Sequence, residues 1–129
     1  RVANLKLHEL DDGLTIIAVP FGEYIDVPVV RCMTASWRRI DETMMPPRVK
    51  LSAGYVNNIL AKTDAVLAGF DEAIFLNNDG HVAEGSGENL FVVKNGALVT
   101  PPLTANILPG ITRSCIMQMA KDELVPLKL

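Results

Sequence analysis

The stretch SAGYVNNILAKTDAVLAGF, residues 52–70, decides the fold class because the hydrophobic period of the chain changes within it. Its apolar side chains recur every three or four residues, which places them on one stripe of a helix. That stripe consists of Val56, Ile59, Leu60, Thr63, Val66 and Leu67. Gly69 follows at the position where a glycine commonly ends a helix. We therefore predict an amphipathic helix that ends at this glycine.

Short segments rich in β-branched residues lie on both sides of the predicted helix. Residues 14–20 (LTIIAVP) and 28–35 (PVVRCMTA) precede it, and their glycine and proline boundaries predict two strands joined by a loop. Four shorter strands are predicted after the helix, at residues 72–77, 81–84, 89–94 and 97–100. No internal repeat or low-complexity tract interrupts this order.

Turn signals and a second helix complete the predicted architecture. Asp79-Gly80 and Asn95-Gly96 are pairs that tight β-hairpin turns favour, so each is predicted to join two neighbouring strands. Residues 111–124 (ITRSCIMQMAKDEL) are predicted as another amphipathic helix. The order of strands, helix, strands and helix predicts an α+β fold, in which a largely antiparallel sheet packs with two main helices.

Composition excludes several classes of protein. The 129 residues are enough for one domain, and 15 acidic against 12 basic residues leave a net charge of −3. Because the chain has no basic run, a broad contact with a nucleic-acid backbone is not expected. No apolar run approaches the roughly 20 residues of a membrane helix, and the first residues lack the layout of a signal peptide. We therefore expect a cytoplasmic protein that binds neither nucleic acid nor membrane.

The cysteines and histidines offer no metal-type pattern. Cys32 and Cys115 each stand alone in an apolar stretch, and we interpret both as buried free thiols. His8 and His81 lie in predicted turns or loops without partners at the spacing of metal ligands. No metal site is therefore predicted.

The corner EGSGENLF, residues 84–91, contains more acids and glycines than a turn requires. A turn between two strands needs one glycine or asparagine to supply a positive φ. Here two glycines and a serine lie between Glu84 and Glu88. Solvated turn acids are the ordinary interpretation of these two residues, and a ligand bound near the corner is the alternative.

A second candidate lies at the start of the last predicted helix. The amides at a helix N-terminus are unpaired and carry partial positive charge, so Gly110, Ile111 and Thr112 are suited to hold a phosphate. The hydroxyl of Thr112 would be a further donor. Ordinary helix capping explains the same residues, so this motif alone does not establish a phosphate site.

Lys50 is the third candidate. It follows an extended segment that contains Pro46 and Pro47, and a surface charge is its ordinary interpretation. A lysine in an apolar setting can instead form a Schiff base, because desolvation favours the free amine. Pyridoxal 5′-phosphate requires such a lysine, a carboxylate at its pyridine nitrogen and a phosphate cup. Lys50, Glu84 and residues 110–112 supply one of each.

These motifs, in this order and at this spacing, resemble a known family. The segments PPRVKLSAGY (46–55), EGSGENLF (84–91), LVTPP (98–102) and ILPGITR (107–113) are similar to those of fold-type IV pyridoxal-phosphate aminotransferases, and most to branched-chain amino-acid aminotransferases. The similarity runs almost without gaps from about Gly13 to Leu124. It implies the larger, α+β domain of these enzymes.

The resemblance implies a role for each matching residue around the cofactor ring. Lys50 would bind the cofactor aldehyde as a Schiff base and would then move the proton between the substrate α-carbon and the cofactor. Tyr55 would hydrogen-bond the phenolic oxygen of the ring. Glu84 would pair with the pyridine nitrogen and keep it protonated, and Leu108 would lie against a face of the ring.

The resemblance also implies the phosphate and substrate contacts. Gly110, Ile111 and Thr112 would bind the cofactor phosphate through backbone amides and the hydroxyl. Phe21 and Tyr24, in the loop after the first predicted strand, would line an apolar pocket for the side chains of leucine, isoleucine and valine. Packing at the end of a strand is the alternative explanation for these two aromatic residues.

The implied activity is transamination between a branched-chain amino acid and 2-oxoglutarate, in a homo-oligomer that uses pyridoxal 5′-phosphate. Relatives also have an N-terminal small domain, with an arginine that binds the cofactor phosphate, and a C-terminal segment with a Gly-Thr turn. We therefore expect residues 1–129 to be a single partial domain, the cofactor-binding part of such an enzyme. Another fold-type IV enzyme, either a D-amino-acid transaminase or an aminodeoxychorismate lyase, and a non-catalytic remnant are the alternatives.

Overall fold

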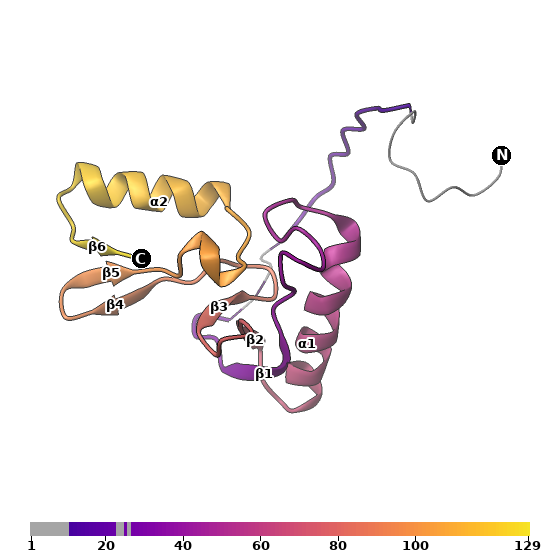
Figure 1. Cartoon of the computed structure of the whole chain (residues 1–129), viewed down its shortest axis with the longest axis horizontal. Helices are drawn as coiled ribbons and strands as arrows, with labels where there is room; N and C mark the ends of the chain where they lie inside the picture. Colours follow the sequence, from indigo (N-terminus) through magenta and orange to yellow (C-terminus); the bar gives the residue numbers. More distant parts are fainter. Residues whose placement is uncertain (1–10, 23–24, 26) are drawn as a thin grey trace.

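The chain folds into two neighbouring lobes, each built from one helix and a three-stranded sheet (Figure 1). The computed structural model describes residues 11–22, 25 and 27–129. The first lobe contains β1 (Cys32–Arg38), α1 (Tyr55–Leu67), β2 (Glu72–Leu76) and β3 (Val82–Gly85). The second lobe contains β4 (Val92–Lys94), β5 (Ala97–Val99), α2 (Ile111–Asp122) and β6 (Leu127–Lys128). Two short 3-10 turns, η1 (Ser52–Gly54) and η2 (Leu103–Ala105), precede the helices.

The sheet of the first lobe joins one parallel and one antiparallel pair of strands. β1 and β2 run parallel, with Cys32 opposite Glu72. A parallel pair needs a long crossover connection, and α1 lies within that connection. β2 and β3 are antiparallel and are joined through the turn at Asp79-Gly80, where the φ of Gly80 is +83°. The hairpin predicted from this pair of residues is confirmed.

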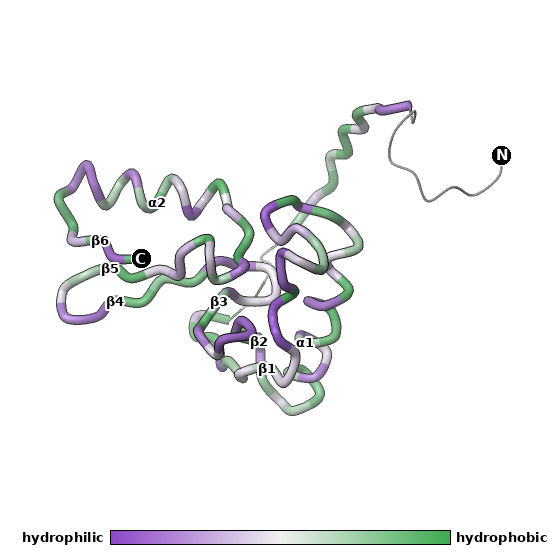
Figure 2. The backbone as a smooth tube through the Cα atoms, in the orientation of Figure 1, coloured by the Kyte–Doolittle hydropathy of each residue, from purple (hydrophilic) through white to green (hydrophobic). Residues whose placement is uncertain are grey.

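Helix α1 packs on the sheet of the first lobe through small side chains. Its buried residues are Asn58, Ala61 and Ala65. Because these side chains are short, the helix lies close to β1 and β2. The larger apolar side chains of the predicted stripe are exposed, including 58% of Val56 and 81% of Leu67. Figure 2 shows hydrophobic residues, in green, along the tube of α1. The helix is confirmed, but its buried face is not the predicted stripe.

The end of α1 has the geometry that the sequence predicts. Gly69 has a φ of +83°, in the left-handed region that only glycine adopts without steric cost. Its N–H donates to the carbonyl of Val66, and the N–H of Phe70 donates to the carbonyl of Ala65. These two bonds form a Schellman motif, which satisfies carbonyl groups at the end of the helix.

The core of the first lobe is formed mostly by small residues. Its members are Ala35, Ala61, Ala65, Ala73, Phe75, Ala83, Ala105 and Ile107. The last two belong to the segment that leads into α2, so this segment is anchored on the first lobe. The start of α2 is thereby placed beside β3.

The second lobe is a hairpin extended by a third strand. β4 and β5 are antiparallel, with Val93 opposite Leu98. Asn95 and Gly96 have φ values of 52° and 73°, and positive values at both central positions are typical of a type I′ turn. β6 runs parallel to β5, and α2 lies alongside this sheet (Figure 1). The predicted α+β fold with two main helices is confirmed, and each sheet mixes parallel and antiparallel pairing.

The predicted strand at residues 14–20 is not formed. This segment extends away from the two lobes, and 87% of Leu14 and 85% of Ile16 are exposed (Figure 1). A strand requires the backbone groups of a neighbouring strand, and none of the described strands pairs with this segment. The second predicted strand is formed, but β1 starts at Cys32, later than the predicted 28–35.

The surface differs from the prediction at the cysteines. Cys32 and Cys115 are both free, as predicted, but they are exposed. Cys32 lies on β1, which is an edge strand, and Cys115 is not among the buried residues of α2.

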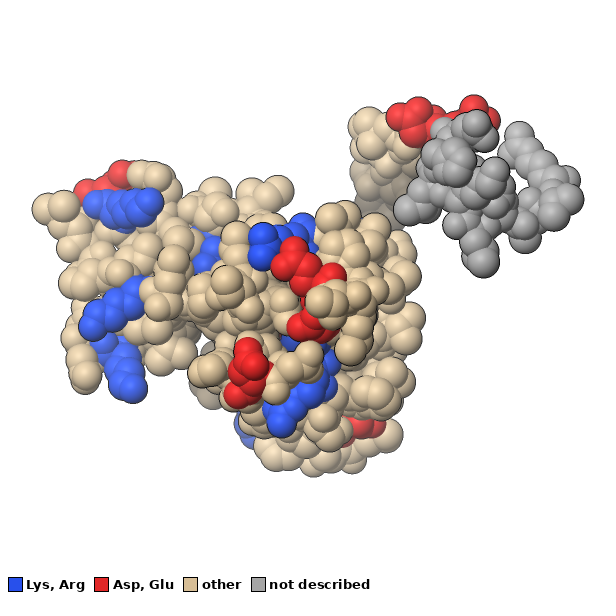
Figure 3. Space-filling model, in the orientation of Figure 1, with Lys and Arg blue, Asp and Glu red and all other residues tan. Residues whose placement is uncertain are grey.

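Charged residues of both signs form separate small groups on the face drawn in Figure 3. Among the described helices, none is long and apolar enough to cross a membrane.

Candidate functional site

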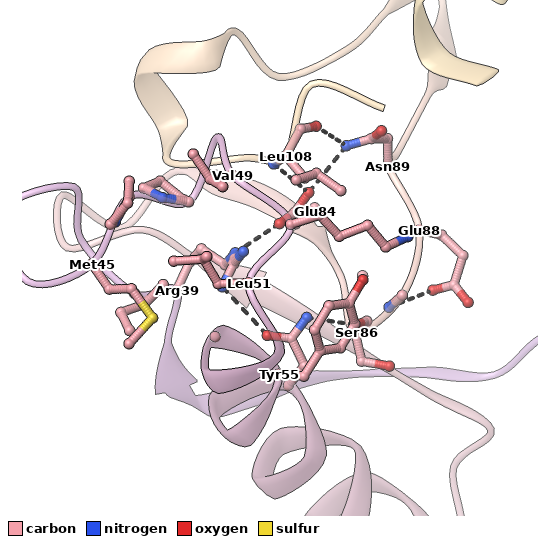
Figure 4. A pocket seen from close by; sticks show the side chains of 18 residues that line it. Arg39, Met45, Val49, Leu51, Tyr55, Glu84, Ser86, Glu88, Asn89 and Leu108 are labelled. Atoms are coloured by element: carbon pink, nitrogen blue, oxygen red, sulfur yellow. Dashed lines mark hydrogen bonds and ion pairs between the residues drawn. The ribbon is translucent and has the colours of Figure 1, made fainter. Parts of the chain in front are cut away.

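Two adjoining hollows lie where the two lobes meet, and they share Lys50 and Leu108. The first hollow is also lined by Arg39, Tyr55 and Glu84 (Figure 4). The second has a volume of about 600 Å³, which is within the usual range of small-molecule sites. Gly110, Ile111 and Thr112 line this second hollow. The fold therefore brings together the seven residues that the resemblance assigns to cofactor binding.

Each predicted residue reaches the hollows from a different part of the fold. Lys50 lies in the loop between β1 and α1, and Tyr55 is the first residue of α1. Glu84 lies on β3, where Ala83 and Gly85 on either side of it are also buried. Residues 108–112 form the entry into α2. The site consequently depends on the packing of α1 and of the α2 entry against the same sheet.

Glu84 is a buried carboxylate with a donor at each oxygen. Only 4% of the residue is exposed. Its Oε1 accepts a hydrogen bond from Arg39 Nε at 2.7 Å, and its Oε2 accepts bonds from Asn89 Nδ2 and the Leu108 N–H, both at 3.0 Å (Figure 4). Burial raises the pKa of Glu84, whereas the charge of Arg39 and the Leu108 N–H oppose this rise.

Arg39 connects Glu84 to helix α1. The arginine is 6% exposed, and its Nη1 donates to Asn58 Oδ1 at 3.3 Å. Asn58 Nδ2 in turn donates to the carbonyl of Ser86 at 2.6 Å. This network ties the buried face of α1 to the corner that follows β3. A buried ion pair is stable only when its remaining donors and acceptors are also satisfied, and the amide groups of Asn58 and Asn89 supply such contacts.

Lys50 and Tyr55 lie together at the rim of the first hollow. The Nζ atom of Lys50 is 6.0 Å from the centre of the Tyr55 ring, which is within the range of a cation–π contact. Lys50 is exposed and Tyr55 is half-buried. Val49 and Leu51 line the same hollow (Figure 4). The amine is thus accessible to a ligand and has apolar neighbours.

The glycine-rich corner is tightly closed by Glu88. The N–H of Gly85 donates to the Glu88 carbonyl at 2.8 Å, and a Cβ atom at Gly85 would lie 2.7 Å from Glu88 Oε2. Glu88 Oε2 also accepts the N–H of Gly87 at 3.2 Å. Burial and the nearby Glu72 raise the pKa of Glu88. A side chain at position 85 would therefore displace the Glu88 carboxylate and would lie 3.3 Å from the Glu88 carbonyl oxygen.

The entry into α2 presents a helix N-terminus to the second hollow. Gly110 is the N-cap, and no side chain caps the helix there. The first amides of such a helix lack backbone partners, and Ile111 and Thr112 are exposed at this end. Arg113 follows within the same turn, is 6% exposed and donates to Thr100 Oγ1 and to the Pro101 carbonyl. This end of α2 is therefore suited to an anion.

The predicted substrate-pocket residues are not part of the two hollows. Phe21 is 76% exposed and lines neither of them. Tyr24 lies outside the described residues. Their role in substrate binding stays a prediction.

Comparisons with known proteins agree with this geometry. The family profile for amino-transferase class IV matches residues 12–128. The chain belongs to the class IV amino-transferases. Within this family, the chain is 46% identical over 121 residues to a probable branched-chain-amino-acid aminotransferase of Aquifex aeolicus. That match covers 93% of the chain and 39% of the relative. The chain thus spans well under half the length of this relative.

Solved structures of class IV amino-transferases have the same fold over the matched region. A crystal structure of the branched-chain aminotransferase of Thermoproteus uzoniensis with norvaline is 49% identical, with a TM-score of 0.83 over 86% of this chain and 37% of that one. The branched-chain amino acid aminotransferase of Thermobaculum terrenum, in its PLP-form, is 41% identical, with a TM-score of 0.74 over 78% of this chain and 33% of that one.

Sequence reasoning missed the polar residues that surround Glu84 in this class IV amino-transferase chain. No catalytic or binding role was predicted for Arg39, Asn58 or Asn89. One signal was present for Asn58, since Asn58, Ala61 and Ala65 recur at helical spacing as a second, small-residue stripe. The pairing of Arg39 with Glu84 joins residues 45 positions apart, and no local pattern indicates it.

Proposed function

We propose that this chain carries the pyridoxal 5′-phosphate site of a branched-chain amino-acid transaminase. The observation that carries the proposal is the convergence of three groups on two connected hollows. These groups are the accessible amine of Lys50, the buried carboxylate of Glu84 and the helix N-terminus at residues 110–112, which no side chain caps. The names of the relatives described above, all branched-chain aminotransferases, support the substrate class.

The residues present fit this cofactor. A pyridine ring requires an acid where its nitrogen lies, and Glu84 is buried and held in one orientation by three donors. A phosphate requires several donors, and the start of α2 offers backbone amides and the Thr112 hydroxyl. When bound, pyridoxal phosphate supplies an aldehyde that reacts with amines and a ring that withdraws electrons from the substrate.

The acid and base chemistry belongs to Lys50, Tyr55 and Glu84. The Lys50 amine would hold the cofactor by condensing with its aldehyde with loss of water, and, once released, would act as general base and acid at the substrate α-carbon. The Tyr55 hydroxyl donates a hydrogen bond to the phenolic oxygen of the ring. Glu84 holds a proton at the ring nitrogen. Of its two oxygens, Oε1 has a single donor among the described residues, so it retains acceptor capacity for this contact.

The binding contacts belong to the entry into α2. Ile111 and Thr112 bind the phosphate with their amides, and Gly110 keeps this approach free of a side chain. Leu108 packs against a face of the ring. The buried Arg113 lies in the first turn of α2. Its positive charge raises the electrostatic potential at this end of the helix, which favours an anion.

Assembly, location and substrates are part of the proposal. We infer transfer of an amino group from leucine, isoleucine or valine to 2-oxoglutarate, in a cytoplasmic homo-oligomer. Exposed apolar side chains such as Val56, Leu67 and Val93 support association with further protein surface. Phe21 and Tyr24 are the proposed contacts with the apolar side chain of the substrate.

The test is an absorbance titration of the chain with pyridoxal 5′-phosphate, followed by borohydride reduction and peptide mapping. We expect a visible absorption band, covalent label on Lys50 alone, and loss of both in Lys50→Ala. Lys121→Ala is the matched control, because Lys121 lies near the C-terminal end of α2, away from the site. Label spread over many lysines, or a band that persists in Lys50→Ala, would contradict the proposal.

A further inference from the structure

Asn89 connects the two ends of the candidate site. Its amide nitrogen carries two hydrogens and uses both (Figure 4). One is donated to Glu84 Oε2 at 3.0 Å, and the other to the carbonyl oxygen of Leu108 at 2.9 Å. Glu84 lies on β3, whereas Leu108 belongs to the entry into α2. A single side chain thus bridges the buried acid and the segment that leads to the helix N-terminus.

The main chain of Leu108 is held at both of its polar groups. Its N–H donates to the same Glu84 oxygen at 3.0 Å. Its carbonyl oxygen accepts from Asn89 and also from the N–H of Gly110 at 2.8 Å. Glu84, Asn89 and Leu108 therefore form a closed triangle of hydrogen bonds, and the N-cap of α2 is attached to it.

Gly110 packs directly against the Asn89 amide. A Cβ atom at position 110 would collide with Asn89 Oδ1 and would lie 3.3 Å from its Cγ. The φ of Gly110 is −63°, which any residue adopts. Glycine is therefore required at this position by the close approach of Asn89, and not by its backbone angles.

We propose that Asn89 is a positioning residue that sets the Glu84 carboxylate and the α2 entry relative to each other. This inference rests on the proposed function, because it assigns Glu84 to the ring nitrogen and the α2 entry to the phosphate. With two donors at Oε2, the carboxylate cannot rotate without losing hydrogen bonds, and Oε1 stays against Arg39 Nε. A rigid cofactor is bound well only when both ends of its site are at the correct separation.

Three variants test this role. Asn89→Ala removes both bonds, and Asn89→Asp keeps the shape but replaces the donor by a carboxyl group beside Glu84. Asn77→Ala is the matched control, since Asn77 is also buried and accepts the His81 N–H at 2.9 Å in the β2–β3 turn. We expect Asn89→Ala to bind pyridoxal 5′-phosphate about ten- to hundredfold more weakly than the unmodified chain, and Asn77→Ala to bind it equally well.

The pH dependence of Asn89→Asp separates positioning from a general structural role. Two adjacent buried carboxyl groups retain a proton between them, and the protonated one can donate to the other. We therefore expect the affinity of Asn89→Asp, relative to the unmodified chain, to recover as the solution is acidified from mildly basic to mildly acidic pH. Arg39, Glu88 and Lys50 also face this corner. They are present in every variant, so their contribution to affinity is common to the two chains that are compared. For Asn89→Ala, the affinity relative to the unmodified chain is expected not to change with pH. If the relative affinity of Asn89→Asp is also independent of pH, the proposal that Asn89 positions the Glu84 carboxylate is refuted.

Amide hydrogen exchange without cofactor tests the triangle independently of the proposed function. In Asn89→Ala, exchange at Leu108 and Gly110 is expected to accelerate by about tenfold or more, while Ala61 and Ala65 in α1 keep their protection. Unchanged exchange at Leu108 and Gly110 would overturn the inference. If exchange accelerates as expected but the unmodified chain binds no cofactor, the proposed function fails and the structural link made by Asn89 stands.

Discussion

Replacing Arg39 by methionine tests the electrostatics of the site most directly. Arg39 and Glu84 form an ion pair at 2.7 Å, with 7% and 6% of their side chains exposed. Removal of one partner from a buried pair typically costs about 3–5 kcal/mol, because the other charge stays buried without compensation. Glu84 would keep the donors Asn89 and Leu108, so we expect a cost near the lower end, about 3 kcal/mol.

The cost of Arg39→Met depends on pH, with a sign that follows from the pKa of Glu84. Burial already raises this pKa above its ordinary value, and the Arg39 charge limits the rise. Without Arg39 the pKa rises further in the folded state only. The folded state then binds more protons than the unfolded state, so stability falls as pH increases through the raised pKa. The variant should consequently be less damaged at pH 5 than at pH 8.

Urea unfolding at pH 5 and pH 8 measures both effects. Arg48→Met is the matched control, because Arg48 and Glu42 form an exposed ion pair at 3.0 Å whose loss is expected to cost less than about 1 kcal/mol. If Arg39→Met does not fold, the double variant Arg39→Met/Glu84→Met should restore folding, since an apolar pair of similar volume is often tolerated. An equal cost at both pH values, or a double variant no more stable than Arg39→Met, would refute the reasoning.

Two glycine substitutions give further predictions. Gly110→Ala places a methyl group against the Asn89 amide, and we expect a loss of about 1–3 kcal/mol in the free energy of unfolding, measured by urea titration. Gly69→Ala forces alanine to a φ near +83° at the end of α1, and a loss of about 1 kcal/mol is expected in the same assay. Gly13→Ala is the control for both, because a Cβ atom at Gly13 would have no heavy atom within 4 Å and this residue has no positive φ. Losses equal to that control would show that neither position is constrained as described.

Features that depend on a few neighbouring residues could be predicted from the sequence. The hairpin at Asn95-Gly96 and the end of α1 at Gly69 require positive φ values, and the residue types reveal that requirement directly. The candidate site residues could also be selected from the sequence, because Lys50, Glu84 and Thr112 are the residue types that the proposed pyridoxal chemistry would require. Resemblance to a family supplied their roles.

Features that depend on distant partners could not be predicted. Residues 14–20 have the composition of a strand, yet they form none, because pairing depends on a neighbouring strand that no described segment supplies. The large apolar stripe of α1 suggested one face, whereas the short side chains of Ala61 and Ala65 allow the closest approach to the sheet. Periodicity identifies candidate faces, and packing selects between them.

The sequence by itself determined the two helices, the tight turns and the residue types on which the proposed cofactor site depends. These follow from backbone preferences and side-chain chemistry that each residue has wherever it lies. Only the tertiary structure decided that Arg39 neutralises Glu84 and that Asn89 links Glu84 to Leu108. Such contacts form because burial removes water, which makes an unpaired donor or acceptor costly, and only folding brings distant partners close together.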